Sequence, residues 1–175
     1  DTTLVLVDLG KGQSRMGGSI LGQTLDQSGD VVPDVDDPQD LVNLVNAVNA
    51  LRAKGQILAY HDRSDGGLLA AVAEMAFAGH VGVALNVDML VTEGDGISDS
   101  RMETGDAKNW AQQVSARREE LTLKALFNEE LGVVLQVRTA ERNEVMQTLR
   151  EHGLSKFSHF IGKTRPASSS INAGK

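Results

Sequence analysis

The sequence predicts an α/β domain in which a single mixed sheet is covered by helices. Its first segment, Thr2 to Leu9, is rich in β-branched and aliphatic residues, as in a buried strand. Two later segments, one from Pro38 and one after Gly67, repeat their apolar residues at helical spacing. Shorter apolar runs alternate with these helical segments, and this order is typical of one sheet with helices packed on it.

The composition excludes several classes of protein. With 175 residues, 41% of them hydrophobic and 3% aromatic, the chain can form one domain with a core of Val, Leu, Ala and Ile. No apolar run reaches the roughly 20 residues that a membrane helix needs. The net charge of -7 and the dispersed Lys and Arg argue against a nucleic-acid partner. We therefore expect a soluble domain that binds neither a membrane nor a nucleic acid.

The sequence contains no cysteine, which excludes disulfides, thiolate zinc sites and a cysteine nucleophile in this chain. Together with the lack of a signal peptide, this favours a cytoplasmic protein. A strand begins directly after Asp1 with no initiator methionine, so we expect the chain to be part of a longer protein.

The first strand ends at Gly10, and a short helix is predicted from Met16 to about Leu25. Gly17 and Gly18 at its start have two explanations. They could receive a phosphate group, or they could let the strand and the helix approach closely, and we favour the close approach.

Asp26 to Asp37 contains five aspartates, which predicts a solvated surface loop. A helix then begins at Pro38 and ends with Arg52, Lys54 and Gly55, a typical C-terminal pattern. We expect one face of this helix to lie on the sheet. Its apolar residues are Leu41, Leu44, Val45, Val48 and Leu51.

The central stretch combines a strand, a tight turn and a helix. Ile57 to Tyr60 is the apolar strand, His61 to Asp65 is the polar turn, and the helix begins after Gly66 and Gly67 and ends at Gly79. The first N–H groups of a helix lack internal partners and lie at the positive end of its dipole. Such a turn is therefore suited to bind a phosphate group.

Two interpretations of this turn remain open from the residues alone. In the first, Gly66 and Gly67 leave room for phosphate, and neighbouring side chains supply oxygen ligands of the kind that Mg²⁺ takes. Those side chains are Asp62, Ser64 and Asp65. In the second, Ser64 or Asp65 caps the helix and the glycines only allow a tight turn. Composition alone favours the second interpretation, because helix caps are common.

Two polar residues of the central helix are expected to have no ligand role. Glu74 should be solvated, and His80 should be a capping or surface residue. Gly82 to Val87 predicts a strand. The Gly-, Asp- and Ser-rich stretch at about 92–106 predicts a mobile loop, because it cannot bury enough apolar surface to offset its ordering entropy.

A further helix is expected from about Ala107, and the motif FNEELG follows it at Phe127 to Gly132. Glu129 and Glu130 could be paired carboxylates, but adjacent residues at a helix end rarely converge on one reacting atom. The helix should bury Trp110, Val114, Leu121 and Ala125. The remaining elements are a strand at Val133 to Val137, a helix at Glu141 to His152, a strand at Phe157 to Gly162, and a linker or tail at 165–175.

Three motifs together resemble one enzyme family. They are MGGSILGQ at Met16 to Gln23, YHDRSDGGLLAAVAEMAFAG at Tyr60 to Gly79, and LFNEELGVVLQV at Leu126 to Val137. In this order they are similar to the proteobacterial formylglycinamide ribonucleotide amidotransferases, also called phosphoribosylformylglycinamidine synthases. The resemblance covers about Thr2 to Thr164, and the acidic stretch Thr92 to Gln113 is its main departure.

The resemblance implies a fold and an activity. Residues 1–164 would form the C-terminal domain of the aminoimidazole ribonucleotide synthetase superfamily, a three-layer α/β/α arrangement with partial ferredoxin-like topology. The parent enzyme would use ATP and glutamine to convert formylglycinamide ribonucleotide to formylglycinamidine ribonucleotide in purine biosynthesis. The HDRSDGG turn matches the second of two homologous synthetase halves, whose auxiliary site holds ADP and magnesium without turnover.

On this match Asp62 would be a magnesium ligand and Ser64 a nucleotide contact, with Gly66 and Gly67 beside the nucleotide. No catalytic residue is assigned in this chain, and the isolated domain is expected to be inactive. Its implied partners are the nucleotide-binding and glutaminase domains of the same parent chain and small-molecule substrates. A homodimer of the isolated domain is also possible.

Two other interpretations stay open. The domain could be a structural interface in which Asp62 and Ser64 only cap a helix. Alternatively, the chain could come from another synthetase of the superfamily, such as a selenophosphate synthetase or a hydrogenase maturation protein. The combination of SDGGL with FNEELG argues against the latter.

Overall fold

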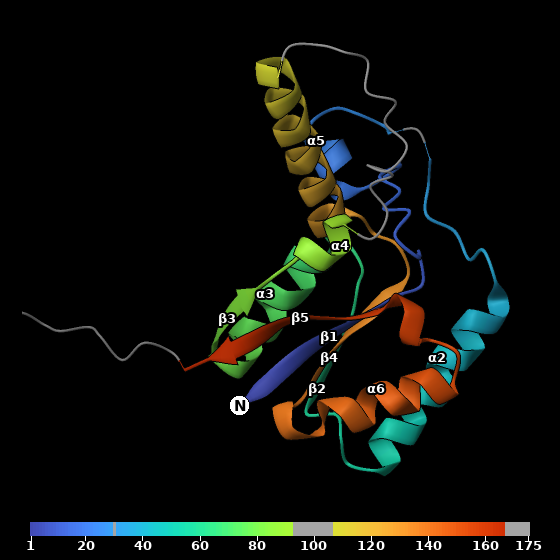
Figure 1. The fold of residues 1–175 in the computed structure, drawn as a ribbon. Helices are drawn as coiled ribbons and strands as arrows, with labels where there is room; N and C mark the ends of the chain where they lie inside the picture. The colour runs from blue at the N-terminus through green and yellow to red at the C-terminus, as the bar shows by residue number, and fades with distance from the viewer. Residues whose placement is uncertain (30, 93–106, 167–175) are drawn as a thin grey trace, which may run out of the picture.

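The computed structural model describes residues 1–29, 31–92 and 107–166. For Thr92 and residues 107–114 it describes the backbone only. Within this part of the chain, five strands form one sheet and helices lie on both of its faces (Figure 1). The predicted α/β class with three layers is confirmed. No helix of the described residues is long and apolar enough to cross a membrane.

The sheet has the strand order β2-β4-β1-β5-β3, so the first strand of the chain lies at its centre. Each of the four pairings is antiparallel, which refines the expected mixed sheet. Both neighbours of the central strand come from the last part of the chain. The strands are β1 (Thr2–Asp8), β2 (Ala59–Asp62), β3 (Gly82–Leu85), β4 (Gly132–Arg138) and β5 (Ser158–Arg165).

One face of the sheet is covered by α2 (Pro38–Ala53) and α6 (Arg142–Glu151), which lie side by side (Figure 1). Strand side chains alternate between the two faces, so Val5 and Val7 of β1 point toward these helices. The predicted apolar face of α2 is correct only in part, because Leu41 and Val45 are exposed. The buried core on this side comprises Val5, Val7, Leu9, Leu44, Ala47, Leu51, Val133, Leu135, Val137, Val145, Leu149 and Leu154.

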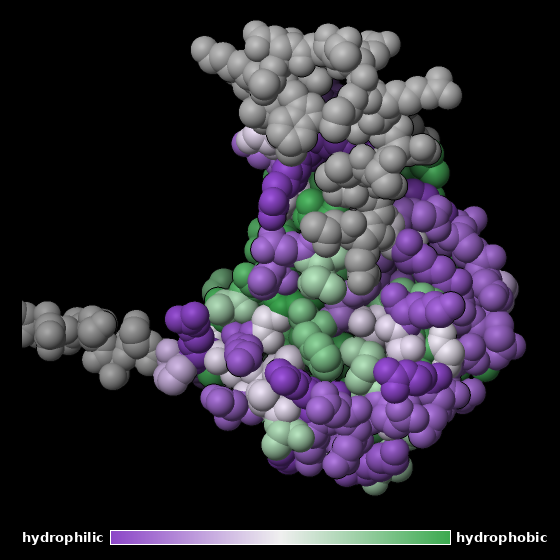
Figure 2. Space-filling view, in the orientation of Figure 1, coloured by the Kyte–Doolittle hydropathy of each residue, from purple (hydrophilic) through white to green (hydrophobic). Residues whose placement is uncertain are grey.

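The opposite face is covered by α3 (Gly67–Gly79), with α4 (Asp88–Thr92) and α5 (Ala107–Phe127) beside it. From there α5 rises away from the sheet (Figure 1). In the view of Figure 1, the surface over α2 and α6 is hydrophilic, while apolar surface gathers near the centre of the molecule (Figure 2). The buried core on this side comprises Leu4, Leu6, Leu68, Ala71, Val72, Val134 and Ile161.

Some element boundaries differ from the prediction. β2 includes His61 and Asp62, which were expected in the turn, because they pair with residues of β4. The helix expected from Met16 is shorter, since α1 spans Ile20–Thr24. The strand expected from Gly82 to Val87 stops at Leu85, and the unpredicted helix α4 follows. The side chain of Asn86 accepts a hydrogen bond from the N–H of Asp88 and so stabilises that helix start.

Several predictions fall on residues that the structure does not describe. These are the mobile loop at 92–106, apart from the backbone of Thr92 in α4, and the burial of Trp110 and Val114. The tail is described only at its start, where Arg165 is the last residue of β5 and pairs with Gly82. Its remaining residues, from 167 on, also lie outside the described part.

Candidate functional site

The motifs that the sequence singled out meet at one end of the sheet. β1 and β2 end there with Asp8 and Asp62, and β4 begins there, with Gly132 opposite Asp8 and Val133 opposite Asp62. The antiparallel register therefore places three loops next to one another. They are residues 9–19, residues 63–66 and residues 128–131.

The turn after β2 is anchored by Arg63, whose side chain is buried. Its Nε donates to the carbonyl of Glu130 at 2.7 Å, and its Nη2 donates to Asp8 Oδ1 at 2.5 Å and to the carbonyl of Leu131 at 3.2 Å. A buried charge is tolerated only when it is paired and hydrogen-bonded, and this arginine meets both conditions. Arg63 therefore fixes the turn to the other two loops.

A second arginine, Arg15, ties the loop after β1 to the FNEELG motif. Its Nε and Nη2 bind the two carboxylate oxygens of Glu130 at 2.7 and 2.9 Å, a bidentate pair. Nη1 and Nη2 of the same guanidinium also bind Asp36. The hydrogen bonds to Glu130 and then to Asp36 raise the pKa of Arg15 above its ordinary value, and the bond from Arg15 lowers the pKa of Asp36.

Glu129 and Glu130 point to different partners, as the sequence suggested. Glu130 is almost fully buried against Arg15, whereas Glu129 reaches the N-terminus of α3. Glu129 Oε1 accepts the N–H of Gly66 at 2.7 Å and, at 3.3 Å, the N–H of Ile20 at the start of α1. The carboxylate of Glu129 thus accepts backbone N–H groups at the starts of two helices.

The predicted capping of α3 by Ser64 or Asp65 is wrong. The N-cap residue is Gly66, which has no side chain that could accept a hydrogen bond from the helix. Ser64 contributes its backbone carbonyl, which accepts the N–H of Gly67. The side chain that binds this helix start belongs to Glu129, which lies far away in the sequence.

The two glycines of the turn have a structural reason. Gly66 and Gly67 both have positive φ, at 84° and 73°, where other residues are strained. A Cβ on Gly67 would lie 2.7 Å from the carbonyl carbon of Phe127 and 2.8 Å from the carbonyl oxygen of Asn128. The glycines therefore allow the turn to pack against the end of α5. Asn128 is buried, and its side-chain amide donates a hydrogen bond to the carbonyl of Lys124 in the last turn of α5.

Asp62 and Ser64 are exposed on either side of the buried Arg63. Asp62 Oδ1 accepts a hydrogen bond from the Tyr60 hydroxyl at 2.5 Å, because residues two apart share one face of a strand. Partial burial, and then the hydrogen bond to Asp62, raise the pKa of Tyr60. Tyr60 therefore stays a neutral donor that orients the carboxylate of Asp62.

The intervening residue, His61, points to the opposite face and contacts α3. Its Nδ1 lies 2.6 Å from the carbonyl oxygen of Asp62, and its Nε2 lies 2.6 Å from Glu74 Oε2. Both partners are acceptors, so only the doubly protonated ring satisfies them. The backbone bond to Asp62 and the bond to Glu74 raise the pKa of His61 against a smaller opposing effect of burial. Glu74 is exposed to solvent, as expected, and also pairs with His61, while His80 is the C-cap residue of α3, as predicted.

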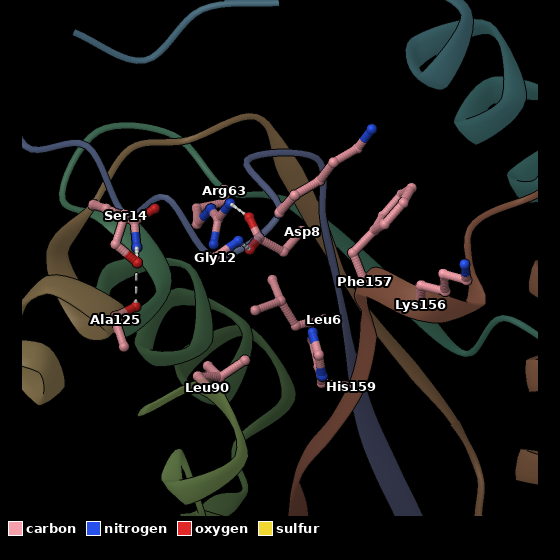
Figure 3. Close-up of a pocket in the computed structure, with 12 residues that line it drawn as sticks. Leu6, Asp8, Gly12, Ser14, Arg63, Leu90, Ala125, Lys156, Phe157 and His159 are labelled. Carbon is pink, nitrogen blue, oxygen red and sulfur yellow. Dashed lines mark hydrogen bonds and ion pairs between the residues drawn. The ribbon is translucent and has the colours of Figure 1, made fainter. Parts of the chain in front are cut away.

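A cavity of about 210 Å³ lies at the same end of the molecule, and Figure 3 shows its lining. Leu6 and His159, opposite each other on β1 and β5, form its sheet side. Arg63, Asp8 and Gly12 lie together at one end (Figure 3). The other lining residues are Lys11, Ser14, Leu90, Ala125, Asn128, Lys156 and Phe157.

Residues 3–171 match the family model described as AIR synthase related protein, C-terminal domain. The chain belongs to this family. Solved structures with the same fold include PurL from Thermotoga maritima complexed with FGAR, at 16% identity and a TM-score of 0.59. This match covers 94% of this chain and 24% of the PurL chain. PurLQS from the same organism has 15% identity and a TM-score of 0.59, with 94% of this chain and 22% of that chain covered.

A second kind of protein shares the fold. HypE from E. coli, a hydrogenase maturation protein, has 21% identity and a TM-score of 0.51, with 94% of this chain covering 44% of that chain. The chain therefore spans less than half of the length of each of these structures. The likenesses establish an AIR synthase-like fold.

One described residue of this AIR synthase related domain, Asp62, is a candidate metal ligand. Among the described residues, no group of three or more His, Asp or Glu side chains could hold a metal ion. Asp62 is an exposed carboxylate that could serve as one ligand, since oxygen ligands suit Mg²⁺. The remaining ligands would have to come from outside the described residues or from water.

Sequence reasoning found the exposed residues of the site but missed those that hold them. No role was assigned from the sequence to Arg15, Arg63 and Asp8, although Arg63 lies within the HDRSDGG motif. Their ion pairs join residues that are distant in the sequence. Arg15 and Glu130 are 115 residues apart, and Arg63 and Asp8 are 55 residues apart. The one available signal was a charged residue within or directly before a glycine-rich motif, Arg63 in HDRSDGG and Arg15 before MGGSILGQ, and such a residue is consistent with a buried ion pair as well as with a ligand.

Proposed function

We propose that this chain is part of a phosphoribosylformylglycinamidine synthase, the ATP- and glutamine-dependent ligase that converts formylglycinamide ribonucleotide to formylglycinamidine ribonucleotide. The membership of the AIR synthase related family supports this proposal. Structures of PurL complexed with FGAR, ATP, ADP and AMPPCP share the fold. The combination of HDRSDGG with FNEELG, which meet at one end of the sheet, favours this enzyme within the superfamily.

Within that enzyme, we assign this domain to an auxiliary Mg-ADP site. The observation that carries the assignment is the outward position of Asp62 and Ser64 on a turn whose middle residue, Arg63, is anchored. Asp62 would be a magnesium ligand, Ser64 a nucleotide contact, and Gly66 and Gly67 would keep side chains away from the nucleotide. Bound magnesium would neutralise phosphate charge, and the chain's own residues position the nucleotide without a chemical step.

The proposal includes partners and a location. The nucleotide-binding and glutaminase domains of the same parent chain would complete the site, in the cytoplasm. The isolated domain would have no glutamine-dependent ATP hydrolysis, because the turnover site and the glutaminase nucleophile lie elsewhere. The isolated domain could also pair with itself through surface that normally meets those domains, and sedimentation at high concentration tests this.

Calorimetric titration of Mg-ADP into the complete polypeptide tests the site. We expect Asp62→Ala to abolish one binding event while circular dichroism stays unchanged. Glu151→Ala is the control, since it removes an exposed carboxylate of α6, outside the three loops of the site, and should leave binding intact. Unchanged binding in Asp62→Ala would overturn the assignment and favour a purely structural role for the turn.

The second candidate is another synthetase of the superfamily, and the likeness to HypE supports it. The chain covers 44% of HypE but 22% of PurLQS, so the length of the native polypeptide separates the two. A protein only about twice as long as this chain would favour the HypE-like alternative.

A further inference from the structure

The cavity between β1, β5, α4 and α5 contains a buried cation with unused hydrogen-bonding capacity. Arg63, which lines it, is only 5% exposed. Its Nε and Nη2 bind the carbonyls of Glu130 and Leu131 and the carboxylate of Asp8. Among the described residues, Nη1 has no hydrogen-bond partner. Nη1 is not one of the fully buried side-chain atoms that lack a partner, so it keeps access to the cavity. An acceptor in the cavity would therefore gain a charge-assisted hydrogen bond from it.

The charges around the cavity favour an anion as that acceptor. Among the described residues of the lining, Asp8 is the one carboxylate, and its oxygens already accept hydrogen bonds. Its Oδ1 accepts from Arg63 and from the N–H of Gly10, and its Oδ2 accepts from the N–H of Gly12. The lining also contains Lys11 and Lys156, although the whole chain carries a net charge of -7. A local excess of positive charge in an acidic protein selects an anionic ligand.

The two lysines are not equivalent. Lys11 Nζ lies 2.7 Å from Asp40, a residue outside the lining, so its charge is partly neutralised. Lys156 is exposed, and no ion pair with a described residue involves it. Lys156 is therefore the residue whose charge can attract a ligand from solvent. It can also be replaced without disturbing the core.

The size of the cavity restricts the ligand further. Its volume of about 210 Å³ equals roughly seven water molecules at ~30 Å³ each. Pockets for drug-sized ligands begin at about 300 Å³. Leu6, Leu90 and Phe157 give the cavity an apolar side. A nucleotide is too large, whereas a phosphate group or a small carboxylic acid fits.

We propose that this cavity is a binding site for a small anion, a phosphate or carboxylate group, bound by Arg63 Nη1 inside and Lys156 at its edge. The site is separate from the Mg-ADP site, because the side chain of Arg63 points inward while Asp62 and Ser64 are exposed on the turn. It therefore does not depend on the assignment of Asp62.

The test is calorimetric titration of the complete polypeptide with inorganic phosphate, in saturating Mg-ADP so that nucleotide sites are filled. We expect Lys156→Ala to weaken one phosphate site about tenfold and Lys156→Arg to retain it. Lys163→Ala is the matched control, since Lys163 is also exposed on this part of the chain, in β5, but does not line the cavity. A parallel titration with acetate distinguishes a carboxylate site from one that requires phosphate.

A second variant tests the cavity itself without changing a charge. Ala125→Met extends a flexible side chain into the cavity and should abolish the same phosphate site, with the fold checked by circular dichroism. Equal weakening by Lys156→Ala and Lys163→Ala would overturn the proposal, as would a full complement of phosphate sites in a folded Ala125→Met variant. The absence of any site sensitive to Lys156 at millimolar phosphate and acetate would overturn it as well.

Discussion

Neighbouring residues of one short turn have opposite environments. Arg63 is buried and makes its hydrogen bonds to the loops after β1 and before β4, while Asp62 and Ser64 on either side are exposed. The comparison shows how a small domain can present polar groups in fixed positions. The inward residue determines where the backbone lies, and the outward residues are then free to meet a ligand.

Replacing the inward residue should have the largest effect. Arg63→Met would leave the carboxylate of Asp8 without its guanidinium partner and two carbonyls without a donor. Removing one partner of a buried ion pair costs about 3–5 kcal/mol. We expect a decrease of that size in the free energy of unfolding, measured by urea denaturation. A loss below about 1 kcal/mol would mean that the turn is held by its glycines instead.

Replacing Glu130, which binds the second anchoring arginine, should cause the next largest loss in the free energy of unfolding. Glu130→Gln keeps the shape of the side chain but removes the charge that binds Arg15. Hydrogen bonds to charged groups contribute about 1.5–3 kcal/mol, so we expect a loss within that range by urea denaturation. Glu151→Gln, at an exposed position of α6, serves as the control and should be neutral. Equal effects of the two changes would contradict an anchoring role for Glu130.

Glu129 is partly exposed, and its replacement should cost less. Glu129→Ala removes the acceptor for the N–H groups of Gly66 and Ile20. Loss of an N-terminal helix cap costs about 1 kcal/mol. Hydrogen exchange of the Gly66 amide should also speed up, while amides of β1 keep their protection. Unchanged exchange at Gly66 would show that this contact is not maintained in solution.

The smallest effect concerns pH and the pair of His61 and Glu74. The pKa of His61 is raised in the folded state, so the folded protein binds the proton more tightly than the unfolded chain does. Its contribution is fully present below the unfolded pKa of about 6.5 and is lost as pH rises through the folded pKa. Glu74→Gln should lower the pKa of His61, observed by NMR titration of the ring. A titration identical to that of the native protein would contradict the pairing.

The sequence predicted the fold better than the site because the two depend on different information. Strand and helix periodicity identified the elements, and the boundaries of α2 and the end of α3 were correct. The helix α4 was missed because it is only five residues long and is followed directly by the Gly-, Asp- and Ser-rich stretch. The helix start at Gly66 was assigned a cap from its own neighbours, since nothing local reveals that Glu129 reaches it.

The same limit applies to the anchors. Local patterns report residues that interact within one turn of a helix or across a hairpin, but Arg15 with Glu130 and Arg63 with Asp8 meet only after the sheet has formed. Glycine patterns were ambiguous for a related reason. Gly67 is required because the backbone of Phe127 and Asn128 lies too close for a side chain. The sequence alone does not distinguish this requirement from space left for a ligand.

The position of β1 at the centre of the sheet has a consequence for how the domain folds. Among the strands of this sheet β1 is synthesised before the others, yet its partners β4 and β5 are synthesised after them, and the hydroxyls of Thr2 and Thr164, 162 residues apart, meet in the finished sheet. Contacts of such high sequence separation slow folding, because long loops must close before they form. During synthesis, the apolar strand TTLVLVD therefore remains unpaired until β4 and β5 have left the ribosome, and in that interval it is a site for chaperone binding or aggregation.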